Sequence, residues 1–192
     1  MAETPAREAI AGLILAGGRG QRLGGVDKGL QPWRGRPLVD HALARLAPQV
    51  SAVMISANRN APAYASRGVR VLADASDDFP GPLAGILAGL RAAATPWLAV
   101  VPCDSPRLPL DLVERLARGV GARRGAVVQR ERLEPVCCLL STALADDLER
   151  YLADGGRKVE GWVARHASPV PFDRPDDAAA FANINTPDDL AG

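Results

Sequence analysis

The chain has few of the residues that build metal centres, disulfides or nucleophilic triads. Its 192 residues include three cysteines, Cys103, Cys137 and Cys138, with no CxxC spacing, and two histidines. A zinc site is therefore not expected, and the odd cysteine number indicates reduced, buried thiols. Neither His41 nor His166 has an obvious serine or cysteine partner, so we predict structural roles for both.

The sequence also lacks a strong charge bias and a long hydrophobic run. It carries 23 basic and 22 acidic residues, a formal net charge of +1. This balance gives no reason to expect a nucleic-acid partner or an anionic membrane surface. No run approaches the ~18 apolar residues of a membrane span, and the first ten residues lack the pattern of a signal peptide. We expect a cytoplasmic protein.

Lysine is the scarcest basic residue. Only Lys28 and Lys158 are lysines, and the other 21 basic residues are arginines. Lysine supplies a compact, flexible point charge where arginine supplies a planar fork. Its position at residue 28, at the end of a glycine-rich segment, suggests a site that needs such a point charge.

That glycine-rich segment is the most informative part of the chain. An apolar run ending at Ala16 is followed at once by GGRGQRLGGVDK, residues 17–28. Glycines permit turns that aim successive N–H groups inward, and Arg19, Arg22 and Lys28 can neutralise phosphate charge. An ordinary strand-to-helix loop runs to only ~2–6 residues. The segment therefore predicts a binding loop for a polyphosphate.

The loop matches neither of the two commonest nucleotide motifs. Leu23 stands where the dinucleotide fingerprint GxGxxG has its third glycine, and Asp27 precedes Lys28 where the P-loop has a glycine. A different class of nucleotide-binding protein is indicated.

Strand-like and helical patterns alternate along the chain. Continuous apolar runs lie at residues 10–16, 50–57, 69–72, 97–101, 125–128 and 136–140, and helical patterns at 38–46, 83–94, 110–117, 142–152 and 159–165. Continuous runs are typical of buried parallel strands. The alternation predicts an α/β fold, a three-layer α/β/α sandwich with a mostly parallel sheet. We expect one domain over residues 1–192, with 1–9 as a flexible tail.

Polar residues and glycines follow the predicted strands. Gly17 follows the first strand, Ser56 and Asn58 the second, Asp74 the third and Asp104 the fourth. The carboxyl ends of parallel strands lie at one edge of a sheet, where ligands bind. A carboxylate such as Asp104 there suits Mg²⁺, although it could instead cap the turn that follows.

Several motifs, taken in order, resemble the signature of the molybdenum cofactor guanylyltransferases. They are LAGG, RLGG, DKGL at 27–30, Gly35 with Pro37 and Leu38, PGPLAG at 80–85, PCDSP at 102–106 and NINTP at 183–187. The resemblance implies a Rossmann-like, nucleotide-diphospho-sugar transferase-like architecture. It places the nucleotide on the N-terminal half and molybdopterin on the C-terminal half.

The resemblance also implies roles for particular residues. The nucleotide would contact Leu15, Ala16, Gly17, Gly18, Lys28, Ser56, Asp74 and Asp104. The catalytic residues would be Lys28, Arg22 and Asp104, with Asp104 binding Mg²⁺, and the pterin would contact Asn183, Asn185, Gly81 and Pro82. Relatives often have asparagine at the position of Ser56, so the base or ribose contact there stays open.

Some of these motifs also have structural interpretations. The segment 80–85 reads equally as the start of a helix with proline in its first turn, and Thr186, Pro187 and Asp189 fit a helix cap. Arg157 and Lys158 could meet the acceptor's phosphate or be surface charges.

The predicted reaction is transfer of GMP from GTP to the terminal phosphate of molybdenum-carrying molybdopterin, with release of pyrophosphate. Delivery proteins for molybdoenzymes are further candidate partners. Alternatives are a cytidylyltransferase acting on the same pterin, a sugar-1-phosphate nucleotidyltransferase, or a non-catalytic nucleotide-binding subunit. Relatives that use CTP tend to read LAAG, so Gly17 in LAGG favours guanine.

Overall fold

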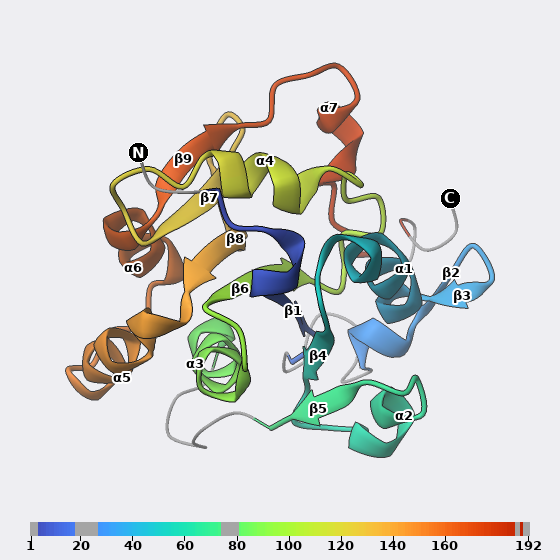
Figure 1. The fold of residues 1–192 in the computed structure, drawn as a ribbon. Helices are drawn as coiled ribbons and strands as arrows, with labels where there is room; N and C mark the ends of the chain where they lie inside the picture. The colour runs from blue at the N-terminus through green and yellow to red at the C-terminus, as the bar shows by residue number, and fades with distance from the viewer. Residues whose placement is uncertain (1–3, 18–26, 74–80, 187–188, 190–192) are drawn as a thin grey trace.

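A seven-stranded sheet forms the centre of the molecule (Figure 1). The computed structural model describes residues 4–17, 27–73, 81–186 and 189. The strand order is β5-β4-β1-β6-β8-β7-β9. Their bounds are β1 Ile10–Leu15, β4 Val53–Ser56, β5 Arg70–Leu72, β6 Trp97–Pro102, β7 Gly125–Gln129, β8 Leu133–Ser141 and β9 Ser168–Pro171. Only β8 runs against its neighbours β6 and β7, so the mostly parallel sheet is confirmed.

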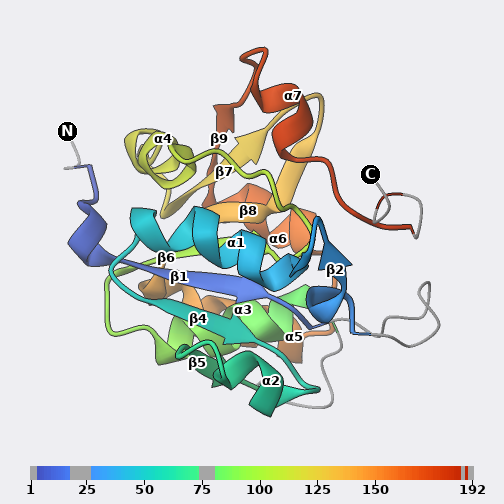
Figure 2. The same ribbon diagram turned by 90° about the vertical axis from the view of Figure 1, so that its right-hand side faces the viewer.

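Helices cover both faces of the sheet, which gives the predicted three layers (Figure 2). One face carries α1 Leu38–Leu46, α4 Leu112–Arg118 and α7 Asp177–Ala180. The other carries α3 Pro82–Ala92, α5 Ala145–Ala153 and α6 Val159–His166. The short elements are α2 Ala61–Ala65, the hairpin of β2 Pro32–Trp33 and β3 Arg36–Pro37, and the 3₁₀ turns η1 Arg7–Ala9, η3 Lys28–Leu30, η4 Ala47–Gln49 and η5 Thr142–Leu144.

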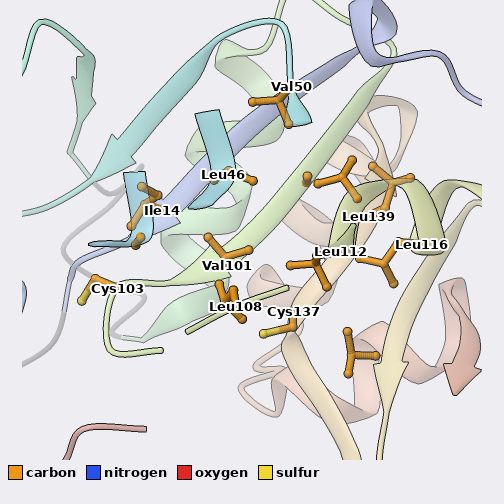
Figure 3. Close-up of a cluster of buried hydrophobic side chains, with 14 of the residues drawn as sticks. Ile14, Leu46, Val50, Val101, Cys103, Leu108, Leu112, Leu116, Cys137 and Leu139 are labelled. Atoms are coloured by element: carbon orange, nitrogen blue, oxygen red, sulfur yellow. The ribbon is translucent and has the colours of Figure 1, made fainter. Parts of the chain in front are cut away.

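The central strand β1 is buried along its whole length because helices cover both of its faces. Figure 3 shows one side of this core, where Ile14 and Val101 from the sheet lie near Leu46. A Cβ added to Gly12 would lie 2.8 Å from a Leu46 methyl carbon. Glycine at position 12 therefore lets α1 pack closely against the sheet.

The apolar pattern did not predict strand β9, the β2–β3 hairpin or the short helices α2 and α7. Strand β9 reads SPVP, and proline is tolerated because β9 lies at the sheet edge. The β2–β3 hairpin has strands of two residues each, too short to give a periodic signal. Its turn residues Arg34 and Gly35 both have positive φ, 48° and 78°, as a tight hairpin turn requires.

The three cysteines are free and buried, as predicted. Burial raises the pKa of the Cys103 and Cys138 thiols to about 12, and burial also raises that of Cys137. Protonated thiols of this kind are poor nucleophiles and poor metal ligands.

No helix among the described residues is long and apolar enough to cross a membrane. Of the segment 1–9 expected to be a tail, residues 7–9 form the turn η1, and Arg7 Nε donates to the carbonyl of Pro48 at 2.9 Å. The single-domain assignment stays a prediction.

Candidate active site

Three segments far apart in the sequence meet at the carboxyl edge of the sheet. The Lys28 ammonium, on η3, donates to Asp104 Oδ2 at 2.6 Å and to Asn185 Oδ1 at 2.6 Å. The Lys28 ammonium therefore lies in direct contact with both the Asp104 carboxylate and the Asn185 side-chain amide. The structure thus brings together Lys28 and Asp104, predicted as catalytic, and Asn185, predicted to bind the acceptor.

The sheet determines where Asp104 lies. Its ladder extends past the strand ends: Cys103 N donates to the Leu15 carbonyl at 3.1 Å, and Ala16 N donates to the Ser56 carbonyl at 2.9 Å. Asp104 therefore follows β6 directly beside the end of β1. This is the edge where a parallel sheet binds its ligands.

The Asp104 carboxylate is only half satisfied. Its side chain is 19% exposed, Oδ2 accepts from Lys28, and Oδ1 is buried with no hydrogen-bond partner among the described residues. Leaving such an acceptor unpaired costs about 1–3 kcal/mol. Neither oxygen accepts a hydrogen bond from the turn that follows, among the residues that the structure describes. An unpaired oxygen at a ligand-binding edge is typical of a site that a ligand completes.

Residues 183–185 run alongside the end of β6. Ile184 N donates to the Asp104 carbonyl at 2.9 Å, and the Ser105 hydroxyl donates to Asn183 Oδ1 at 2.7 Å. The Ile184 side chain is buried with Trp33 and Leu38, which fixes the segment against the start of α1. Both predicted asparagines are thereby held next to the Asp104 segment.

The capping interpretation of Thr186 and Asp189 is confirmed. Thr186 Oγ1 accepts from Asp189 N at 3.2 Å, and Asp189 Oδ2 accepts from Asn185 N at 2.9 Å and Thr186 N at 2.8 Å. These backbone hydrogen bonds lower the pKa of the Asp189 carboxyl. The cap fixes the Asn185 backbone and leaves its side chain to contact Lys28. Pro187 lies outside the described residues.

The residues predicted to contact the nucleotide differ in solvent exposure. Gly17 is exposed at the end of β1, whereas the Leu15 and Ala16 side chains are buried in the core. Ser56 is 1% exposed, and a Cβ on Gly85 would lie 2.5 Å from its hydroxyl oxygen. The Ser56 hydroxyl thus faces α3 across a tight contact. Gly18, Arg22 and Asp74 lie outside the described residues.

The segment that includes Gly81 and Pro82 starts α3. Gly81 has φ of +121° and Pro82 stands in the first turn, as the structural interpretation expects. Arg157 Nη1 donates to the carbonyls of Leu152 at 2.8 Å and Gly156 at 2.7 Å, which binds it to the end of α5. Contact of these residues with the pterin stays a prediction.

Two histidines predicted to be structural have structural partners. The His41 ring bonds through Nε2 to the Trp33 carbonyl at 2.8 Å, and His166 Nε2 lies 2.8 Å from Asp147 Oδ1. Neither contact involves the residues at the sheet edge.

Sequence reasoning missed the residues around Asp27. The Tyr64 hydroxyl donates to Asp27 Oδ1 at 2.5 Å, and Asn60 Nδ2 donates to Asp27 Oδ2 at 3.0 Å. The sequence signals at Asp27 were its place directly before the scarce lysine and within the DKGL motif. Its partners lie more than thirty residues away: Tyr64 is within the five-residue helix α2, and Asn60 directly precedes that helix.

Comparison with known proteins shows the family. The family model described as MobA-like NTP transferase domain matches residues 12–170. The molybdenum cofactor guanylyltransferase of Ralstonia nicotianae is 56% identical to this chain and that of Cupriavidus taiwanensis 53%, with 92% and 96% of both chains covered, respectively. The chain belongs to the molybdenum cofactor guanylyltransferases. It is accordingly a nucleotidyltransferase, an enzyme of molybdenum cofactor biosynthesis.

The fold agrees with this family. The solved structure of molybdopterin-guanine dinucleotide biosynthesis protein A from Archaeoglobus fulgidus matches with a TM-score of 0.79 at 25% identity, covering 94% of this chain and 95% of that one. The predicted nucleotide-diphospho-sugar transferase-like sandwich is therefore confirmed, as is the resemblance on which it rested.

Proposed function

We propose that this guanylyltransferase transfers GMP from GTP to the terminal phosphate of molybdopterin at the Lys28 edge of the sheet, with release of pyrophosphate. The observation that carries the proposal is the contact of Lys28 with both Asp104 and Asn185 at 2.6 Å. A point charge between a carboxylate and an amide suits a polyphosphate that lies beside a polar acceptor. The identity to named guanylyltransferases over most of the chain supports the choice of substrates.

The chemistry needs charge stabilisation more than proton transfer. A molybdopterin phosphate oxygen forms a bond to the α-phosphorus of GTP, and the bond from that phosphorus to the bridging oxygen breaks. The bonding electrons leave with pyrophosphate. Because the attacking phosphate is already an anion near neutral pH, no general base is required. Orientation and electrostatic stabilisation then supply the rate enhancement.

Lys28 is the described residue best suited to stabilise that charge. Its ammonium already reaches the segment after β6 and the C-terminal segment, and it forms an ion pair with the half-satisfied Asp104. We assign Lys28 to the phosphates, together with Arg22 and the backbone amides of Gly17 and Gly18. Arg22 and Gly18 lie outside the described residues, so their part rests on the family resemblance.

The proposal includes Mg²⁺ held by Asp104. The buried Oδ1 has no partner among the described residues. A hard carboxylate oxygen is the donor that Mg²⁺ prefers, and the ion commonly takes only one or two carboxylates from the protein. When bound, it would neutralise phosphate charge and orient the leaving group.

The two substrates would occupy neighbouring parts of the edge. We assign the nucleotide to the strand ends and the pterin to the C-terminal segment and the start of α3. The nucleotide contacts are Leu15, Ala16, Gly17, Ser56 and Asp74, and the pterin contacts are Asn183, Asn185, Gly81 and Pro82.

The test is pyrophosphate release with GTP or CTP in the presence of Mg²⁺ and molybdopterin. We expect release with GTP that depends on the pterin. Equal release with CTP would favour cytidylyl transfer. Release that needs a sugar 1-phosphate instead of the pterin would overturn the acceptor, and nucleotide binding without any release would indicate a non-catalytic subunit.

A further inference from the structure

Helix α2 holds the residue that precedes Lys28 from two sides. Tyr64, within α2, donates its hydroxyl hydrogen to Asp27 Oδ1, and Asn60, at the N-terminal end of α2, donates its amide to Asp27 Oδ2 at 3.0 Å. Both carboxylate oxygens of Asp27 are thereby occupied. In contrast to Asp104, Asp27 has no oxygen left unpaired.

Tyr64 also contacts the residue that follows Lys28. A Cβ on Gly29 would lie 2.4 Å from the Tyr64 hydroxyl oxygen, so the hydroxyl sits directly against the Gly29 backbone. The Tyr64 side chain is 0% exposed and belongs to the same hydrophobic core as α1. A rigid, buried ring therefore touches the residues on both sides of Lys28.

The Tyr64 hydroxyl is a permanent donor under physiological conditions. Burial, together with the hydrogen bond to Asp27, raises its pKa well above that of an ordinary tyrosine. The O–H group is therefore retained, and the hydrogen bond to the carboxylate is charge-assisted and strong.

We propose that Tyr64 is a positioning residue for the transfer reaction, acting through Asp27 to fix the backbone at Lys28. The lysine side chain is flexible, so the Lys28 backbone must be held in place for the ammonium to contact Asp104 and Asn185 together at 2.6 Å. Tyr64 holds this backbone through Asp27 and Gly29 and does not itself contact substrate. The catalytic consequence rests on the proposed function of Lys28, but the effect on the position of Lys28 does not.

The composition of the chain makes this proposal directly measurable. There are two tyrosines, Tyr64 and Tyr151, and two lysines, Lys28 and Lys158. Tyr64→Phe removes the hydroxyl and keeps the ring. Tyr151→Phe is the matched control, since the Tyr151 hydroxyl donates to the Lys158 carbonyl at 3.2 Å, away from Lys28. Protein labelled with ¹³C at lysine Cε gives two lysine signals, which Lys158→Arg assigns.

We expect Tyr64→Phe to move the Lys28 Cε signal and to leave the Lys158 signal in place. The kcat should fall about tenfold with the KM for GTP changed less than kcat, because misplacing a catalytic group by a fraction of an ångström costs turnover before ground-state binding. Tyr151→Phe should leave the Lys28 signal and kcat as in the wild type.

A Tyr64→Phe protein with an unmoved Lys28 signal overturns the proposal, whatever its kcat. If this variant does not fold, Asp27→Asn decides, because the amide keeps the shape of the carboxylate and removes the charge that strengthens the bond from Tyr64. An unmoved Lys28 signal in that variant overturns the proposal equally. Lys28→Ala separates the catalytic role of Lys28 from its positioning by Tyr64. Wild-type turnover in Lys28→Ala refutes the catalytic role and does not affect the conclusion that Tyr64 positions Lys28.

Discussion

Two ion pairs in this protein use a largely buried aspartate in different ways. Asp177 of α7, 5% exposed, accepts from both terminal nitrogens of Arg115 at 2.8 and 2.9 Å, and its Oδ2 also accepts from Arg174 N at 3.1 Å. Asp104, 19% exposed, meets Lys28 with one oxygen and leaves the other unpaired among the described residues. We call the Arg115–Asp177 pair closed, because both carboxylate oxygens accept hydrogen bonds, and the Lys28–Asp104 pair open, because one oxygen does not.

The difference follows from the choice of cation. The planar guanidinium of Arg115 matches both oxygens of a carboxylate, and this pair joins α4 to α7 with the Arg115 group stacked 3.6 Å from the Phe172 ring centroid. An ammonium satisfies one oxygen and can be turned toward another anion. The closed pair suits a structural joint, and the open pair suits a site that exchanges partners with a ligand.

Removing the cation from the open pair should have the largest effect on turnover. Lys28→Ala is expected to lower kcat about 10²-fold or more, the scale for loss of one preorganised charge-stabilising group. Lys28→Arg should restore only part of it, since a planar fork cannot reproduce both contacts of the ammonium. Arg118→Ala is the control, and it should show wild-type kcat because Arg118 is an exposed cation of α4 paired with Glu114. Near-wild-type kcat for Lys28→Ala would remove Lys28 from the mechanism.

Breaking the closed pair should cost stability instead. Asp177→Asn is expected to lower the free energy of unfolding by about 3 kcal/mol, because Arg115 is left buried beside a neutral partner. Turnover per folded molecule should stay at the wild-type level. Urea unfolding monitored by tryptophan fluorescence measures the first quantity and pyrophosphate release the second. A stable variant, or one that folds fully but turns over slowly, would contradict the comparison.

The closed pair should also contribute to acid sensitivity. Hydrogen bonds from Arg115 hold the pKa of Asp177 below its ordinary value of 3.8. Stabilisation by the Asp177 carboxylate is therefore present above that ordinary value and is lost as pH falls through the lower folded-state pKa. Below about pH 4 the Tm of Asp177→Asn should fall less steeply than that of the wild type. Glu114→Gln, in an exposed pair with Arg118, should follow the wild-type curve.

The smallest expected effect concerns nucleotide choice. A Cβ added to Gly17 would lie 3.9 Å from its nearest neighbour, the Ser56 carbonyl oxygen, so Gly17→Ala should fold normally. A methyl group next to a bound base costs about 1–3 kcal/mol, so the preference for GTP over CTP should drop about fivefold or more. Titration calorimetry with both nucleotides measures it. An unchanged preference would mean that Gly17 does not face the base.

The sequence was most informative where local patterns determine the structure. Continuous apolar runs predicted β1 and β6, and a parallel sheet then required Gly17 and Asp104 to follow strands at one edge. The predicted bounds of α1, 38–46, agree with the structure because its pattern has no break between Pro37 and the start of η4.

Long-range side-chain contacts could not be predicted in this way. The open Oδ1 of Asp104, the Tyr64–Asp27 contact and the Arg115–Asp177 pair all depend on how segments pack, and no local periodicity encodes them. Asn185 was expected near an acceptor from the family resemblance, but its contact with Lys28 came only from the structure.

The comparison of open and closed pairs is tested most directly by Asp104→Asn. The measurement is the increase in Tm produced by GTP, with Mg²⁺ and with EDTA, in the wild type, Asp104→Asn and Asp177→Asn. A ligand at a hundredfold excess over its Kd adds about 2.7 kcal/mol of stability. We predict that Asp104→Asn loses the Mg²⁺-dependent part of this increase while its ligand-free Tm stays near wild type, and that Asp177→Asn does the reverse. An Asp104→Asn protein that keeps the full Mg²⁺-dependent increase, or that is destabilised as much as Asp177→Asn, would contradict the account.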